Sequence, residues 1–144
     1  MVKTILALLA TCPLLIATTT QNIEKAFLQN NSKMLLTLLP AKSHINISLP
    51  APISFADQVS NQQAYFLFKK IFSSYSTFEF YSERQKPARQ SDRTILKARW
   101  SFRDNKNNNQ YVFNIFFYLI RIETQDTEHK QNTWKITEIK AEKI

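Results

Sequence analysis

The chain contains no glycine among its 144 residues, whereas average usage of about 7% would supply roughly ten. Every turn that needs left-handed backbone must therefore use another residue, and asparagine tolerates that conformation best. The absence also excludes glycine-rich phosphate loops, the dinucleotide-binding fingerprint, the G-x-S-x-G nucleophile elbow and the EF-hand loop. One cysteine and two histidines leave no Cys/His metal cluster. We expect neither a metal nor a cofactor.

The first twenty residues have the features of a secretory signal peptide. Lys3 supplies a positive start, residues 5–17 are mostly apolar and uncharged, and small residues follow up to Thr20. The apolar stretch is shorter than the roughly 20 residues that span a bilayer. A buried N-terminal helix is the alternative. We predict a signal peptide over residues 1–20, cleaved after Ala17 or up to Thr20, and a periplasmic or extracellular protein.

Residues 21–144 are expected to form one domain. Hydrophobic residues make up 44% of the chain and charged residues 21%, which permits a packed core. Cleavage removes Cys12, so no disulfide is expected even in an oxidising compartment, and stability must come from the core. Beyond the signal, we find no segment long and apolar enough to be a membrane span.

The clearest predicted element is an amphipathic helix that starts behind Ser60. Ser60 and Gln63 have the spacing of a capping box, in which each side chain bonds the other's backbone N–H. Apolar residues then recur at helical spacing, namely Ala64, Leu67, Phe68, Ile71, Phe72 and Tyr75.

An earlier helical pattern begins at Thr20 and breaks at residues 30–32, where Asn or Ser can cap a second short helix. Pro40 ends that helix.

Alternating patterns predict strands in the remaining segments. Residues 44–49 alternate, and the chain to Ser60 is then expected to be a loop that contains Asp57. Polar loops are expected at 104–110, where three asparagines can form the turn, and at 123–132. The other strands are expected at 77–84, 93–103, 111–122 and 134–139. Helices followed by a run of strands predict an α+β fold with a curved antiparallel sheet over the helices.

The strand expected at 111–122 is apolar on both faces apart from Asn114 and Arg121. Such a strand lies centrally in a sheet that is covered on both sides. One face would pack on the helices. The other needs cover from neighbouring side chains or from a second subunit.

The order of these elements resembles the nuclear transport factor 2-like superfamily. It also resembles, more closely, a family of small secreted bacterial proteins of unknown function within that superfamily. The segments that carry the likeness are 23–32 with Leu38 and Leu39, 45–49, 63–72, 78–81 and 134–139. The resemblance implies a cone-shaped α+β fold with a pocket at its open end, and it brings no established activity. Similar proteins often pair through the outer face of the sheet, which implies a homodimer.

Enzymes of this superfamily, which includes ketosteroid isomerase, place an acid or a His–Asp pair in the cone pocket. The candidates here are His44, Asp57 and Glu79, with Glu138 as a further strand carboxylate. A buried carboxylate could act as a general base. Solvated surface positions are the favoured interpretation for all of them.

Aromatic residues offer a different kind of site. Tyr65, Trp100, Tyr111 and Tyr118 are candidates for lining an apolar ligand pocket. The favoured interpretation is that these residues fill the core, because the mature chain contains neither glycine nor cysteine.

Basic residues are concentrated between Arg84 and Lys106, and part of that charge falls on one strand face. Lys97, Arg99 and Arg103 share this face and would form an anion-binding patch for acidic lipids or polysaccharides. The face has no interleaved stacking aromatics, which argues against nucleic acid. A solvated sheet face is the alternative.

Three functions are compatible with these patterns. The first is an exported, non-catalytic domain that binds a small apolar ligand or a partner protein in or beside the cone pocket. The second is an isomerase- or dehydratase-like enzyme that uses a pocket carboxylate or histidine. The third is a binder of anionic surfaces.

The export prediction is tested by mass spectrometry of the protein purified from the exported fraction of its host. We expect an intact mass that corresponds to an N-terminus between residues 18 and 21, because signal cleavage follows the small residues at the end of the apolar stretch. An intact chain that begins at Met1 would contradict it.

Overall fold

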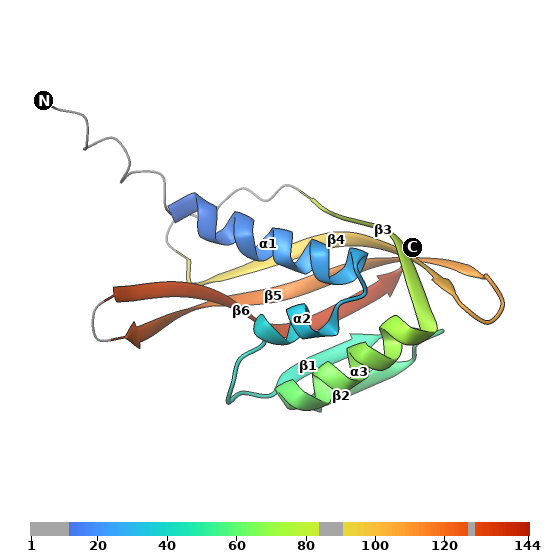
Figure 1. Cartoon of the computed structure of the whole chain (residues 1–144), viewed down its shortest axis with the longest axis horizontal. Coiled ribbons are helices and arrows are strands. Elements are labelled where there is room, and N and C mark those ends of the chain that lie inside the picture. Colours follow the sequence, from blue (N-terminus) through green and yellow to red (C-terminus); the bar gives the residue numbers. More distant parts are fainter. Residues whose placement is uncertain (1–11, 84–90, 127–128) are drawn as a thin grey trace, which may run out of the picture.

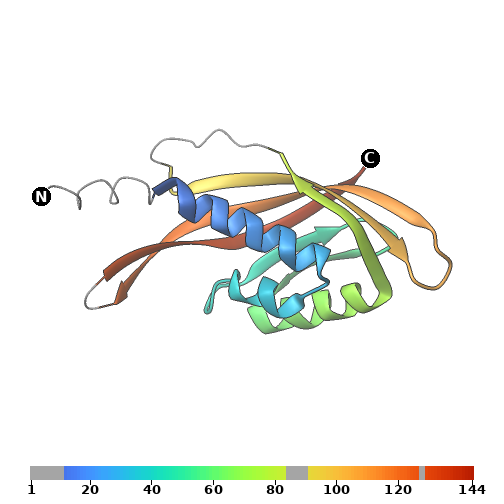
Figure 2. The same ribbon diagram turned by 45° about the horizontal axis from the view of Figure 1, so that its top comes forward.

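The computed structural model describes the backbone of residues 12–83, 91–126 and 129–144, and the side chains of these ranges except 12–17 and 124–132. Three helices lie on one side of a six-stranded curved sheet (Figures 1 and 2). The elements are α1 (Cys12–Leu28), α2 (Ser32–Thr37), β1 (Ile45–Leu49), β2 (Phe55–Val59), α3 (Asn61–Ser74), β3 (Tyr75–Ser82), β4 (Arg93–Asp104), β5 (Gln110–Asp126) and β6 (His129–Lys143). The predicted α+β class with a curved sheet is confirmed. No helix in the described ranges has the length and apolarity needed to cross a membrane.

The strands follow the order β2-β1-β6-β5-β4-β3 across the sheet. All neighbours are antiparallel except β1 and β6, which run parallel and pair at Asn46 and Glu138. The short β1–β2 hairpin therefore joins the sheet through the last strand of the chain. The expected cleavage positions at residues 17–20 fall within α1. Among the side chains described in that helix, the large buried ones, Ile23 and Phe27, lie beyond these positions.

Two predicted loops are wrong. The segment before Ser60 contains strand β2, which pairs with β1 from Phe55 to Val59. Only Val59 of this edge strand is fully buried, so its sequence lacks an alternating pattern. The expected loop at 123–132 is largely a hairpin, with Glu123 paired to Asn132 and Gln125 to Lys130. These polar residues continue the ladder past the core, where backbone hydrogen bonds do not require apolar side chains.

Three of the described residues adopt the left-handed backbone that glycine usually supplies. They are Asn30, Ser54 and Asn108, with φ between 50° and 60°. Asn108 lies in the expected turn between β4 and β5, and Asn30 follows α1. Asn31 then caps α2, its side chain accepting a hydrogen bond from the Met34 N–H at 3.2 Å. Asparagine thus supplies the tight turns at two of the three positions, as the glycine-free sequence requires.

The predicted helix behind Ser60 is confirmed as α3. Both hydrogen bonds of its capping box are present, from the Gln63 N–H to Ser60 Oγ at 3.2 Å and from the Ser60 N–H to Gln63 Oε1 at 2.9 Å. Its buried face consists of Ala64, Phe68, Ile71 and Phe72. The amphipathic pattern therefore identified both the start of the helix and its core face.

The centre of the core is the ring of Phe27 on α1, which is fully buried. Its centroid lies 4.6–6.0 Å from five other aromatic rings, contributed by Phe68, Phe72, Phe80, Trp100 and Phe117. These rings come from α3, β3, β4 and β5. One side chain therefore ties the first helix to most of the later elements.

Helix α1 also covers one edge of the sheet. Glu24 accepts two hydrogen bonds from Ser82 on the edge strand β3, from its backbone N–H at 3.2 Å and its hydroxyl at 2.6 Å. An edge strand with an unpaired N–H invites pairing with other chains. The Glu24 carboxylate satisfies this donor.

Phe27→Ala is expected to lower the free energy of unfolding by about 3–5 kcal/mol, because it leaves a cavity between α1 and four other elements. Leu28→Ala is the matched control, since the neighbouring Leu28 is 48% exposed and its truncation should cost less than about 1 kcal/mol. Urea denaturation followed by circular dichroism measures both. Equal losses in the two variants would contradict the assigned core.

Candidate functional site

The candidate catalytic side chains lie on separate elements and are exposed. His44 precedes β1, Asp57 is on the edge strand β2, and Glu79 is on β3 at the opposite edge of the sheet. Asp57 accepts a hydrogen bond from the Gln58 N–H at 2.7 Å, and Glu79 accepts one from Ser101 Oγ at 3.3 Å. The fold does not bring these three groups together in one enclosed site.

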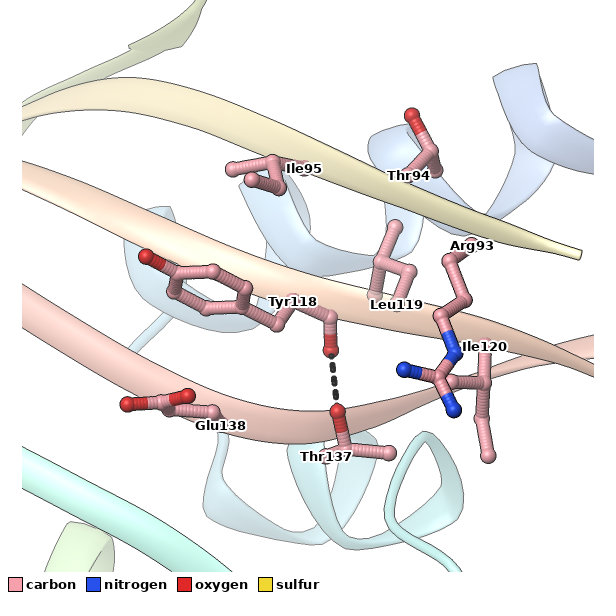
Figure 3. A pocket seen from close by; sticks show the side chains of 8 residues that line it. All are labelled: Arg93, Thr94, Ile95, Tyr118, Leu119, Ile120, Thr137 and Glu138. Atoms are coloured by element: carbon pink, nitrogen blue, oxygen red, sulfur yellow. Dashed lines mark hydrogen bonds between the residues drawn. The ribbon is translucent and has the colours of Figure 1, made fainter. Parts of the chain in front are cut away.

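The four aromatic candidates are likewise distributed over different parts of the molecule. Trp100 is fully buried, and its indole N–H donates to Thr77 Oγ1 at 2.9 Å. Tyr111 stacks on Phe102 with ring centroids 5.5 Å apart, and Tyr65 on α3 contacts the exposed Phe66. Tyr118 faces the side of the sheet away from the helices, which we call the outer face (Figure 3). The four side chains therefore do not line a common pocket.

The basic candidates share the outer face of β4, as the alternating pattern indicated. Lys97 pairs with Glu83 at 3.4 Å and lies 6.0 Å from the centre of the Phe116 ring. Arg103 lies 5.8 Å from the Phe78 ring centre, and Arg99 is exposed between Tyr81 and Asn114 of the neighbouring strands. The more N-terminal basic residues Arg84, Lys86 and Arg89 lie outside the described residues.

A groove of about 530 Å³ crosses the outer face over β4, β5 and β6 (Figure 3). Its position follows from a β-bulge: Tyr118 pairs with Glu138 and Leu119 with Ile136, which leaves Thr137 as an extra residue. Thr137 Oγ1 donates to the Tyr118 carbonyl at 3.1 Å. Bulges of this kind bend a strand and redirect its side chains. The lining residues are Arg93, Thr94, Ile95, Tyr118, Leu119, Ile120, Thr137 and Glu138.

The groove combines an apolar centre with two charged ends. Ile95 is 48% exposed and lies beside Tyr118 on the next strand. Arg93 and Glu138 flank this centre, and neither side chain forms a hydrogen bond or ion pair within the described part of the chain. Apart from Tyr118 and Glu138, the groove residues were not among the sequence candidates. Their signal was the two-sided apolar pattern of residues 111–122.

Among the described side chains, no three His, Cys, Asp or Glu residues lie close enough together to hold a metal ion. Among the described titratable groups, Tyr75 at the start of β3 is perturbed by its surroundings. Burial raises the pKa of its phenol, with smaller contributions in the same direction from Asp104 and Tyr111.

Comparison with solved structures defines the class of fold. A DUF4783 family protein from Bacteroides uniformis superposes with a TM-score of 0.63 at 15% identity, covering 86% of this chain and 95% of its own. A ketosteroid isomerase-like protein from Erwinia carotovora atroseptica also gives 0.63, at 11% identity over 92% and 95%. An NTF2-like protein of unknown function in nutrient uptake from Rhodospirillum rubrum gives 0.58, at 15% identity over 90% and 98%.

The chain therefore has the nuclear transport factor 2-like fold that its sequence predicted. Its structural neighbours include the DUF4783 family, in agreement with the predicted likeness to a family of unknown function. No protein-family model matches the sequence, and no curated protein does. At these identities the comparison establishes the fold, and function must be argued from the surface of this chain.

Proposed function

We propose that the chain is an exported, non-catalytic domain that binds a partner protein through the outer sheet face, and that this partner is a second copy of itself. The observation that carries the proposal is the apolar centre of that face. Phe116, Tyr118 and Ile120 of β5 are only half-buried there, and Ile95 beside Tyr118 is 48% exposed. Tyr81, on the edge strand β3, is 47% exposed on the same face. The three described helices all lie on the opposite side (Figure 2).

Apolar side chains gathered on one exposed face favour association. Residues 111–122 carry apolar side chains on both faces of the sheet, and the helices bury only those on the inner face. A second copy would bury those on the outer face. The sequence resemblance likewise implies a homodimer that pairs through the outer face of the sheet.

Charges around the apolar centre support an interface between like copies. The outer row of β4 carries Arg93, Lys97, Arg99 and Arg103. The outer row of β6, on the other side of β5, carries Glu138 and Glu142 with Lys140 between them. An isologous two-fold interface presents the same patch twice. A two-fold axis along β5 would bring the basic row of one copy towards the acidic residues of the other, which favours this pairing over an unrelated apolar surface.

The exposure of His44, Asp57 and Glu79 supports a non-catalytic role. A general base needs a defined position beside its substrate, and enzymes enclose such groups to exclude water. These three groups are solvated and occupy different elements. His44, Asp57 and Glu79 therefore do not form the acid–base site that an isomerase- or dehydratase-like enzyme would need.

Sedimentation velocity of the exported protein over a concentration series tests the dimer. Ile95→Glu is expected to weaken self-association at least about tenfold, because it buries an unpaired charge at the interface. Phe66→Glu is the matched control, since Phe66 is 62% exposed on α3, away from the outer face. Circular dichroism verifies the fold of both variants. A protein that stays monomeric at its highest soluble concentration would contradict the proposal, as would equal weakening by the two variants.

Anion binding is a second candidate, favoured by the exposed Arg99 and Arg103 in one row on β4. Lys97 is partly neutralised by Glu83. Affinity for vesicles with acidic headgroups should fall steeply with salt and be lost when Lys97, Arg99 and Arg103 are all changed to Gln. Vesicle flotation at several salt concentrations measures this. If the triple variant bound the vesicles as tightly as the unmodified protein, the patch would be excluded as the binding site.

A further inference from the structure

A second hollow of about 540 Å³ lies where α3 joins β3, on a different part of the molecule from the outer-face groove. Its walls are the C-terminal half of α3, the β1–β2 turn and the β4–β5 turn. These three segments are far apart in the sequence. Their convergence was not predictable without the arrangement of the strands.

One wall of this hollow is apolar. Ile53 and Phe55 from the β1–β2 hairpin and Leu67 from α3 pack against the core while remaining partly exposed to the hollow. Tyr75 completes the wall, with its ring edge-on to Phe102 at a centroid distance of 5.3 Å. The volume lies within the range of small-molecule sites, about 300–1,000 Å³.

The hollow is held in shape by hydrogen bonds between its walls. The Asn105 N–H donates to the Ser74 carbonyl at 3.0 Å, and Asn105 Nδ2 donates to the Ser73 carbonyl at 3.1 Å. Ser76 Oγ donates to Asn105 Oδ1 at 2.7 Å. Asn105 thus clamps the β4–β5 turn onto the end of α3, so that a ligand would meet a preformed site.

The rim carries two lysines. Lys70 projects from α3 and Lys106 from the β4–β5 turn, and within the described residues neither ammonium group is in an ion pair. The single acid of the lining, Asp104, accepts a hydrogen bond from the Lys106 backbone N–H at 2.9 Å within its own turn. The rim therefore has a net positive charge.

Tyr75 adds a donor inside the hollow. Its hydroxyl has one described hydrogen bond, a long one of 3.5 Å to the Pro52 carbonyl, which a better acceptor could replace. An ordinary phenol, with a pKa of about 10, is already protonated at physiological pH, and burial raises the pKa of Tyr75 further. The hydroxyl can therefore donate a hydrogen bond.

We propose that this hollow binds a small carboxylate with an apolar body, such as a short fatty acid. Lys70 and Lys106 hold the carboxylate at the rim, and the apolar body lies against Ile53, Phe55 and Leu67. Charge complementarity selects an anion over a cation of the same length, and the apolar wall selects an alkyl or aryl body over a purely polar one. This site is separate from the proposed dimer interface.

Isothermal titration calorimetry with octanoate, octan-1-ol and octylammonium tests the charge selection. Octanoate is expected to bind at least about tenfold more tightly than octylammonium, since charge-assisted contacts form only with the anion. The double variant Lys70→Gln/Lys106→Gln should weaken octanoate at least about tenfold while leaving octan-1-ol unchanged.

Lys69→Gln/Lys42→Gln is the matched control. It removes the same charge from two exposed lysines that do not line the hollow, and it should retain octanoate affinity. Equal affinity for the three probes, or equal weakening by the two double variants, would overturn the proposal. The Lys70→Gln/Lys106→Gln variant should sediment like the unmodified protein. The ligand site and the dimer can therefore be disproved independently.

Discussion

The packing of Phe27 is the interaction on which the rest of the structure depends. Its ring is in contact with aromatic side chains from α3, β3, β4 and β5. No disulfide is available in the described chain to hold α1 in place, so the burial of apolar surface must do so. A helix from the start of the domain is thereby fixed across β3, β4 and β5.

This packing also decides where binding can occur. Around Phe27 the space between helix and sheet is filled by rings, and the polar candidates from the sequence lie on the outside. The two hollows of the described chain that carry our proposals lie on the outer face and at the junction of α3 and β3. A bulge at Thr137 shapes the first, and the Asn105 clamp shapes the second.

Much of the fold could be predicted from the sequence because its elements are locally specified. The capping box at Ser60, the apolar face of α3 and the asparagine turn at residue 108 all depend on neighbours within a few residues. The site was less predictable. Lys97, Arg99 and Arg103 were correctly placed on one face by alternation, whereas the convergence of Lys70, Ile53 and Lys106 depends on contacts between distant segments.

The sequence by itself determined the class of the fold, the position of α3 and its core face, and the use of asparagine in place of glycine at tight turns. These properties follow from periodicity and from backbone sterics, which act locally. Only the tertiary structure decided that β2 is a strand, that β5 and β6 extend through a polar segment, and which residues share each hollow. Strand pairing and the lining of each hollow bring together residues that are far apart in the chain. No local sequence pattern specifies such contacts.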